Sequence, residues 1–363
     1  MAHSNASSHL ARYLLAAYTF LVVYASLHPL RGWHDRGASL FVFLEPAIPR
    51  YVTAFDITVN IAAYLPFGFL VVAALHPMRW ATVGVVIALA ASAVLSGAME
   101  ALQTLLPNRV SSNLDFVLNI AGGFTGAIVG AWFAPRLIDN ETARRLRLTW
   151  FRPGPRTDLG LVIVALWLFT QLNPETLLFG TGSLRGALES VPGTLHPAEV
   201  FVGVEAVVAA AHLVAAGLFV GTLVHPRRSI WMIVTLVVAG AIAMRAFAFA
   251  ALFAPENMFK WATSGALQGF VAGLMMLLVI ARLRRSVRVV IACLFFMFAT
   301  ALVNVVPGNP YTANALQVWR QGHFLNFNGL TGFVSTIWPF LALAYLLFAV
   351  IPVGQRRREM AED

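Results

Sequence analysis

The sequence predicts an all-α integral membrane protein with about ten transmembrane helices and both termini in the cytoplasm. Of its 363 residues, 59% are apolar and 11% are charged, whereas soluble globular proteins carry roughly 25% charged residues. The apolar residues form ten continuous runs without the alternation of barrel strands. Basic residues gather on alternate sides of these runs. This composition excludes a soluble enzyme, a disordered chain and a disulfide-stapled secreted domain.

The ten apolar runs are the expected transmembrane helices, and each approaches the roughly 20 residues that a spanning helix needs. They cover residues 10–29, 57–75, 81–106, 114–134, 158–173, 198–224, 229–253, 260–280, 287–306 and 332–352. Arg12, followed by an apolar stretch within the first run, also fits the start of a secretory signal. We expect an uncleaved helix instead, because ten spans complete the alternation of charge. Cys293 is the only cysteine, so no intrachain disulfide forms.

The formal net charge is +9, and the arginines mark one side of the membrane. Most basic residues lie in the loops and termini that we assign to this side: Arg12, Arg79, Arg136, Arg144, Arg145, Arg147, Arg152, Arg156, Arg227, Arg228, Arg282, Arg284, Arg285, Arg288, Arg356, Arg357 and Arg358. Fewer lie in the opposite loops: Arg31, Arg36, Arg50, Arg109, Arg185, Lys260 and Arg320. The positive-inside bias therefore places both termini in the cytoplasm. Because the charge follows the topology, we expect no binding of nucleic acid.

The strongest division of the chain lies at residues 136–157, which contain six arginines and the tripeptide Pro153-Gly154-Pro155. We expect a four-helix transmembrane unit over residues 1–135 and a basic cytoplasmic linker over residues 136–157. A six-helix transmembrane unit with a basic cytoplasmic C-terminus then covers residues 158–363.

Polar residues of the first unit gather at one depth, although such residues are costly inside a membrane. By the expected direction of the chain, all of them lie at the extracytoplasmic end. They are Asp56 and Asn60 in the second run, Glu100 and Gln103 in the third, Arg109 and Ser112 in the following turn, and Asp115 and Asn119 in the fourth run. At ~100° per residue, the last two share a face with Gly122, Gly126 and Gly130. Small residues at this spacing let helices pack closely, so the polar residues are expected to face the bundle interior.

Three sequence blocks of this unit resemble the signature of VanZ-like membrane proteins. They are Asp56-xxx-Asn60-xxx-Tyr64-x-Pro66-Phe67-Gly68-Phe69, Glu100-xx-Gln103-xxx-Pro107-x-Arg109 and Ser112-xx-Asp115-xxx-Asn119-xx-Gly122. The resemblance covers about residues 12–135 and implies a bacterial cytoplasmic membrane. The family is named for a protein that gives low-level resistance to the lipoglycopeptide teicoplanin, which implies a link to antibiotic susceptibility. It implies no biochemical activity and says nothing of the last six expected helices.

The charge of the polar residues predicts a ligand. Three carboxylates and Arg109 sum to −2 in a partly dry place, which persists only if carboxyls are protonated or a cation neutralises them. No histidine accompanies them, so we expect no zinc site, while an oxygen-ligated Mg²⁺ or Ca²⁺ and an amine of a bound molecule both stay open. We predict a pocket that holds the headgroup of a membrane lipid, an envelope glycolipid or a lipoglycopeptide. The alternative is that these groups only join the helices to one another.

The sequence favours a binding protein over an enzyme. It contains no nucleophile elbow, no HExxH motif and no phosphate-binding glycine loop, and it implies no cofactor. Catalysis would fall to Glu100 or Asp115 as a general base, which requires a raised pKa.

Two ionisable residues of the second unit, Glu205 and Arg245, lie at matching depths in consecutive runs, so we predict a buried ion pair. With His212 they would form a proton relay, which suits the alternative of a secondary transporter or lipid translocase. A non-catalytic scaffold of an envelope-building complex is a further alternative.

Aromatic and amide side chains in residues 307–331 predict an interfacial helix or a sugar-binding loop.

Overall fold

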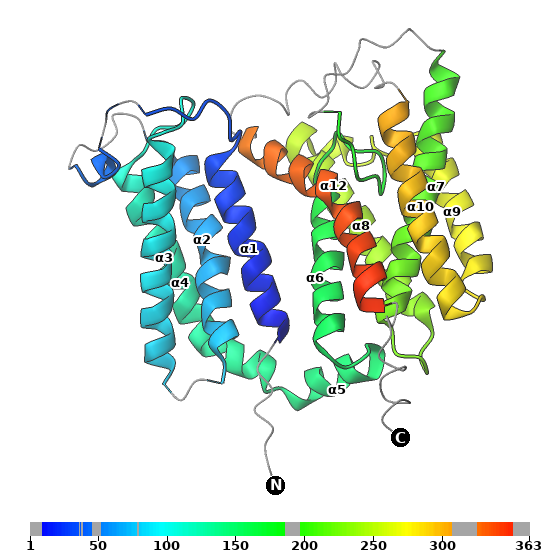
Figure 1. Cartoon of the computed structure of the whole chain (residues 1–363), viewed down its shortest axis with the longest axis horizontal. Coiled ribbons are helices and arrows are strands. Elements are labelled where there is room, and N and C mark those ends of the chain that lie inside the picture. Colours follow the sequence, from blue (N-terminus) through cyan, green and yellow to red (C-terminus); the bar gives the residue numbers. More distant parts are fainter. Residues whose placement is uncertain are drawn as a thin grey trace, which may run out of the picture. The chain divides into compact units, whose positions relative to one another are not determined.

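The structure is a computed structural model that describes residues 9–35, 37, 39–45, 52–77, 80–185, 197–306 and 325–350. These residues form eleven α-helices and no strand longer than an isolated bridge. The chain divides into two compact units, Met1–Thr149 and Trp150–Asp363, which we call unit 1 and unit 2 (Figure 1). The division falls inside residues 136–157, where the arginine-rich segment separates the apolar runs.

Unit 1 contains four long helices and one short one. They are α1 (His9–Leu27), α2 (Ala54–Leu75), α3 (Ala81–Gln103), α4 (Asn113–Ile138) and α5 (Glu141–Trp150), whose last residue begins unit 2. Figure 1 shows α1 to α4 side by side. The C-terminal ends of α1 and α3 and the N-terminal ends of α2 and α4 therefore share one end of the unit.

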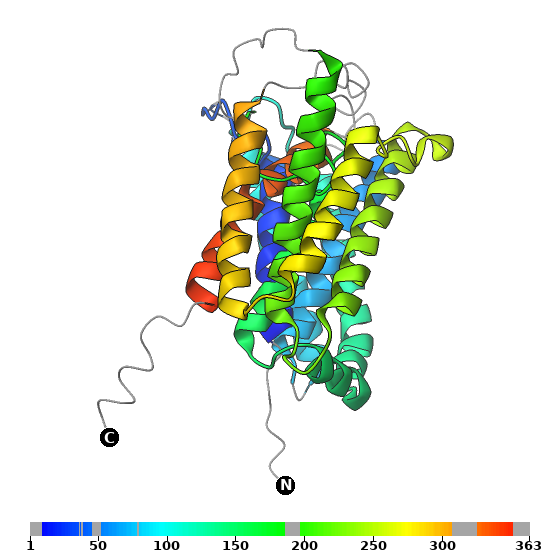
Figure 2. The ribbon, with the colours of Figure 1, turned by 90° about the vertical axis from the view of Figure 1, so that its right-hand side faces the viewer.

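Unit 2 contains the other helices. They are α6 (Pro155–Thr170), α7 (Ala198–Leu223), α8 (Ile230–Phe253), α9 (Ser264–Ile280), α10 (Arg285–Val305) and α12 (Leu325–Tyr345). Helix α7 packs against α6, α8, α9 and α10, and 89% of its apolar stretch is buried. Figure 2 shows it between α9 and α10. This burial explains why α7 is apolar all round, as a helix enclosed by others must be.

All ten apolar runs contain a helix, and eight of these helices are long and apolar enough to cross a membrane. The chain is therefore a multi-pass membrane protein. Helix α9 is apolar but has 17 residues, and α6 has 16, which is about 24 Å against the roughly 30 Å of a bilayer core. The expected fifth span, residues 158–173, is wrong at its end, because α6 stops at Thr170. Residues 307–324 of the expected interfacial loop lie outside the described residues.

Helices α2 and α4 pack backbone against backbone through glycines. A Cβ on Gly126 would lie 1.9 Å from the carbonyl oxygen of Leu65, and one on Gly122 would lie 2.3 Å from that of Ile61. From the other side, a Cβ on Gly68 would lie 1.8 Å from the carbonyl oxygen of Gly123. The close packing predicted from the glycine spacing is confirmed.

Residues 171–185, which we call the buried segment, follow α6 and lie inside unit 2 without forming a helix. Backbone groups inside a membrane protein need internal partners where no helix supplies them. Side chains from five helices, together with Gln171 of the segment itself, provide them. Trp167 and Gln171 bond Phe179, His212 bonds Thr181, Arg245 bonds Asn173, Thr176 and Leu177, Asn304 bonds Gly182 and Leu184, and Thr336 bonds Ser183.

A proline in α12 explains one further contact of the buried segment. Pro339 has no N–H, so the carbonyl of Ser335 has no partner within the helix. The N–H of Gly182 donates to this carbonyl at 2.8 Å. Gly182 has a φ of +85°, and a Cβ there would lie 2.9 Å from the Pro339 ring, so both conformation and space require glycine.

Candidate functional site

Asn60 and Asp115 join α2 to α4 at the end of unit 1 where both helices begin. The Asn60 amide Nδ2 donates to Oδ1 of Asp115 at 2.8 Å, and both side chains are half-buried. The hydroxyl of Ser112 caps α4 by accepting from the Asp115 N–H at 3.4 Å. The first turn of α4 therefore holds Asp115 against α2.

Glu100 brings α3 into the same site. Its side chain is 2% exposed, and Oε2 accepts from the N–H of Ser112 at 2.8 Å. The charges of Glu100 and Asp115 act on each other, and so do those of Asp115 and Asp56. The structure thus places Asp115 of α4 within electrostatic range of both Glu100 of α3 and Asp56 of α2. The negative charges of Glu100 and Asp115 repel each other, and burial leaves little water to screen this repulsion.

Three further polar side chains lie below these carboxylates. The Asn119 amide donates to the hydroxyl of Ser96 at 3.0 Å, and both residues are buried. Tyr64 of α2 is 2% exposed, and its hydroxyl interacts with the side chain of Ser96 and lies within electrostatic range of Glu100. Tyr64, Ser96 and Asn119 therefore form a buried polar layer beneath the carboxylates.

Asp56 lies at the rim of the site. Its carboxylate accepts from both the N–H and the hydroxyl of Thr53, while its own N–H donates to that hydroxyl. This reciprocal pair is a capping box, which satisfies donors at the start of α2.

Gln103 and Arg109 bind the end of α1. Gln103 Nε2 donates to the carbonyl of Ser26 at 2.9 Å, and Arg109 donates to those of Ala25 and His28 at 2.8 and 3.0 Å. A cation is favourable at a helix C-terminus, where carbonyls lack partners. Burial lowers the pKa of the Arg109 guanidinium. These two residues therefore hold α1 beside the carboxylates.

The neighbouring imidazole of His28 predicts a pH dependence. Burial lowers its pKa below the ordinary 6.5, and the charges of Arg109 and Arg31 lower it further. Below pH 6.5 the unfolded chain therefore binds the proton first, and stability falls as the pH drops. We expect the unfolding temperature in detergent to fall more between pH 7.5 and 5.5 for the wild type than for His28→Gln. Equal losses in both proteins would contradict this role of His28.

Sequence reasoning overlooked Ser96 and did not assign Tyr64 to the site. Ser92, Ser96 and Glu100 follow one another at four-residue spacing on α3, and all three are buried. Asn60 and Tyr64 repeat this spacing on α2. Small and polar residues four apart on one face were the available signal, because positions i and i+4 are neighbours on a helix.

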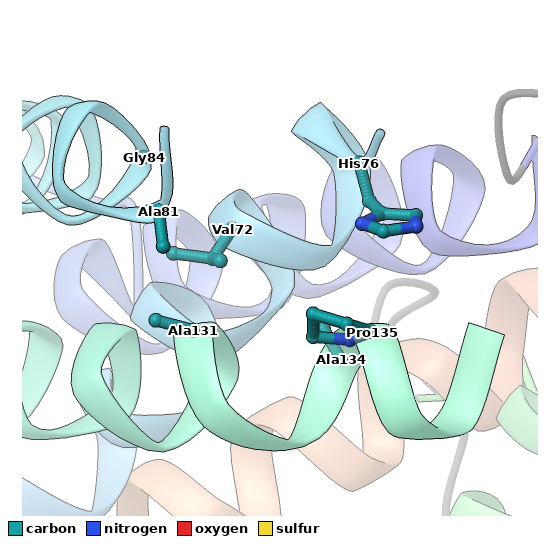
Figure 3. Close-up of a pocket in the computed structure, with 7 residues that line it drawn as sticks. All are labelled: Val72, His76, Ala81, Gly84, Ala131, Ala134 and Pro135. Carbon is teal, nitrogen blue, oxygen red and sulfur yellow. The ribbon is translucent and has the colours of Figure 1, made fainter. Parts of the chain in front are cut away.

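An open recess lies at the opposite end of unit 1 (Figure 3). It is lined by Val72, His76, Ala81, Gly84, Ala131, Ala134 and Pro135. His76 faces Pro135 in Figure 3, and its Nε2 lies 2.9 Å from Oδ1 of Asp139. Apart from this imidazole the lining is apolar, so the recess does not suit a polar headgroup.

In unit 2, Glu205 and Arg245 act on each other electrostatically, but the described residues form no salt bridge between them. Arg245 is 1% exposed and donates to three carbonyls of the buried segment. The expected direct ion pair is therefore not formed. The guanidinium of Arg245 donates its hydrogen bonds to carbonyls of the buried segment instead of to the Glu205 carboxylate. A carbonyl accepts from the guanidinium without the cost of burying a second charge.

His212 is buried completely, and backbone groups occupy both of its ring nitrogens. Nδ1 lies 3.0 Å from the Val208 carbonyl, while Nε2 accepts from the Thr181 N–H at 3.2 Å. A neutral imidazole with its proton on Nδ1 satisfies both contacts. His212 thus holds the buried segment to α7.

Within the described residues, no three His, Cys, Asp or Glu side chains lie together as a metal site.

The residues that form the polar site of α2, α3 and α4 lie within a recognisable family domain. The family model of VanZ/LLP1 matches residues 6–134. Residues 6–134 are a VanZ/LLP1 domain. Comparison with curated proteins and with solved structures found no match. The VanZ/LLP1 domain ends within α4, so the family match does not extend to unit 2.

Proposed function

We propose that the VanZ/LLP1 domain binds the headgroup of a cell-envelope lipid or glycolipid at the Asp115 site, on the extracytoplasmic face of a bacterial cytoplasmic membrane. The site comprises Asp56, Asn60, Tyr64, Ser96, Glu100, Ser112, Asp115 and Asn119. Gln103 and Arg109 contribute indirectly by holding α1. The observation that carries the proposal is the hydrogen bond between Asn60 of α2 and Asp115 of α4, with the buried carboxylate of Glu100 within electrostatic range of Asp115.

The charges of the site favour a headgroup that brings hydrogen-bond donors. Glu100 and Asp115 repel each other, and an amine or sugar hydroxyls would relieve this repulsion, whereas a phosphate would increase it. Asp56, Asn60 and Asp115 are half-buried and thus accessible, while Glu100 is buried and supports Ser112. Glycolipids and lipoglycopeptides carry such donors, which supports an effect on teicoplanin susceptibility.

Asp115→Asn tests this function, because the new amide oxygen still accepts from Asn60 while the charge is lost. A charge-assisted hydrogen bond contributes about 1.5–3 kcal/mol, so we expect the variant to bind its headgroup at least about tenfold more weakly. Native mass spectrometry of the purified protein would show which envelope lipid co-purifies and whether the variant loses it. Cells that express each protein would be compared for teicoplanin susceptibility.

Asp139→Asn is the matched control, since Asp139 is exposed and lies at the far end of the same unit. We expect it to retain both the lipid and the phenotype. The proposal is wrong if Asp115→Asn keeps the co-purified lipid and the wild-type phenotype. That result would favour a scaffold or a transporter, for which the polar site is tolerant of change.

A further inference from the structure

Four arginines lie at the end of unit 2 that contains Tyr345. Arg152 precedes α6, Arg156 lies in its first turn, and Arg285 and Arg288 lie in the first turn of α10. The charges of Arg285, Arg156 and Arg152 act on the Tyr345 hydroxyl. Arg285 and Arg288 also act on Arg152, and Arg285 acts on Arg288. We call these five residues the basic cluster.

Backbone hydrogen bonds hold Arg152 of the basic cluster, and one glycine makes room for Tyr345. The Arg152 N–H donates to the carbonyl of Leu223 at 2.9 Å, and its Nε donates to that of Val224 at 3.2 Å. A Cβ on Gly160 would lie 2.8 Å from the Tyr345 hydroxyl, so the glycine makes room for the phenol. The cluster is therefore held in place before any ligand arrives, which reduces the entropy cost of binding.

Within the residues that the structure describes, no salt bridge joins an arginine of the basic cluster to a carboxylate. Burial lowers the pKa of the Arg152 guanidinium, and the charges of Arg285 and Arg288 lower it further. The Nε of Arg288 is inaccessible to solvent and has no hydrogen-bond partner. Asp158 follows in α6 but is 4% exposed, and with it counted the charge of the cluster is still +3. An anion at this place would relieve the repulsion and satisfy the free donor.

The location of the basic cluster within unit 2 indicates that the anion comes from the membrane. Helices α7 and α9 end here, α8 and α10 begin here, and the adjoining loops carry Arg227, Arg228, Arg282 and Arg284. The guanidinium of Arg228 lies 5.1 Å from the centre of the Trp150 ring. Arginine-rich loops and tryptophan mark the membrane interface, and the positive-inside bias assigns this end to the cytoplasmic leaflet.

An exposed apolar strip runs along another face of α10. It consists of Val287, Val290 and Leu294, which are 42%, 54% and 55% exposed. Their spacing of three and four residues places them on one helix face. At ~100° per residue, Arg285 and Arg288 lie on the other side of α10 from this strip, so the strip shows only that α10 faces apolar surroundings beside the cluster.

We propose that the basic cluster binds the phosphate of an anionic phospholipid from the leaflet that faces this end of unit 2. Guanidinium groups bind phosphate through paired, charge-assisted hydrogen bonds, and the Tyr345 hydroxyl donates one more. Basic sites between transmembrane helices on the cytoplasmic side suit such headgroups.

The test measures binding of phosphatidylglycerol and phosphatidylcholine to the full chain in detergent by native mass spectrometry. We expect the wild type to retain one phosphatidylglycerol and Arg288→Gln to bind it at least tenfold more weakly. Tyr345→Phe keeps the ring and its packing, and we expect a loss of a few fold. Arg227→Gln is the matched control, because Arg227 is an exposed arginine at the same end, and it should bind as the wild type does.

Two results would overturn the proposal. One is equal retention of the neutral and the anionic lipid, and the other is unchanged binding in both Arg288→Gln and Tyr345→Phe. The unfolding temperature in neutral lipid shows whether each variant is folded, and Tyr345→Phe decides the test if Arg288→Gln is not. Inorganic phosphate should leave the unfolding temperature unchanged. A rise equal to that from phosphatidylglycerol would show a site for free phosphate instead of lipid.

Discussion

Arg245→Leu is expected to destabilise unit 2 by about 3–5 kcal/mol, the range found when a buried charged contact loses one partner. The substitution leaves the carbonyls of Asn173, Thr176 and Leu177 without their donor. No water is at hand to replace it, since Arg245 is 1% exposed. Thermal unfolding in detergent would measure the loss. Amide exchange should increase across the buried segment before it increases elsewhere.

Comparison with three other variants separates hydrogen bonding from charge pairing at Arg245. Arg245→Lys keeps the charge but places one ammonium opposite three carbonyls, so we expect an intermediate loss. Glu205→Gln should cost little, because Glu205 makes no direct contact with the guanidinium. Lys260→Met removes an exposed cation and should be neutral. A loss in Glu205→Gln as large as in Arg245→Leu would show that the charge pair dominates.

Gly126→Ala is expected to have the second large effect, a destabilisation of unit 1 by about 3 kcal/mol. The added methyl would lie 1.9 Å from the carbonyl oxygen of Leu65, so α2 and α4 must separate. Overpacking costs about 1–3 kcal/mol, and a clash with backbone belongs at the upper end because backbone cannot rotate away. Separation of the helices would also draw Asn60 away from Asp115. Unfolding temperature and headgroup binding should therefore fall together.

Gly97→Ala is the control for this prediction. A Cβ on Gly97 would lie 3.4 Å from the ring of Phe116, an ordinary van der Waals distance. We expect this variant to match the wild type or exceed it slightly, because alanine favours the helix by up to about 1 kcal/mol. If both alanine variants are equally stable, the contact of α2 with α4 is not as close as the glycines indicate.

Most of the polar site in unit 1 could be predicted from the sequence. Helical periodicity and the direction of each run place Asp56, Glu100 and Asp115 at one end of three neighbouring helices, and the structure places Asp115 within electrostatic range of the other two. What periodicity does not specify is the partner of each group. Asp56 caps its own helix, while Gln103 and Arg109 bind backbone of α1. These choices depend on helix rotation and on the path of the turns.

Unit 2 shows the limit of periodicity more sharply. The sequence by itself determined that this is a multi-pass helical membrane protein, because so many apolar residues with so few charges have no soluble arrangement. Only the tertiary structure decided that α6 stops at Thr170 and that the buried segment lies among the helices. An irregular backbone has no periodic sequence pattern from which it could be predicted. It is stabilised by His212, Arg245 and Asn304, which lie on helices that follow it in the chain. Their role exists only once those helices have packed.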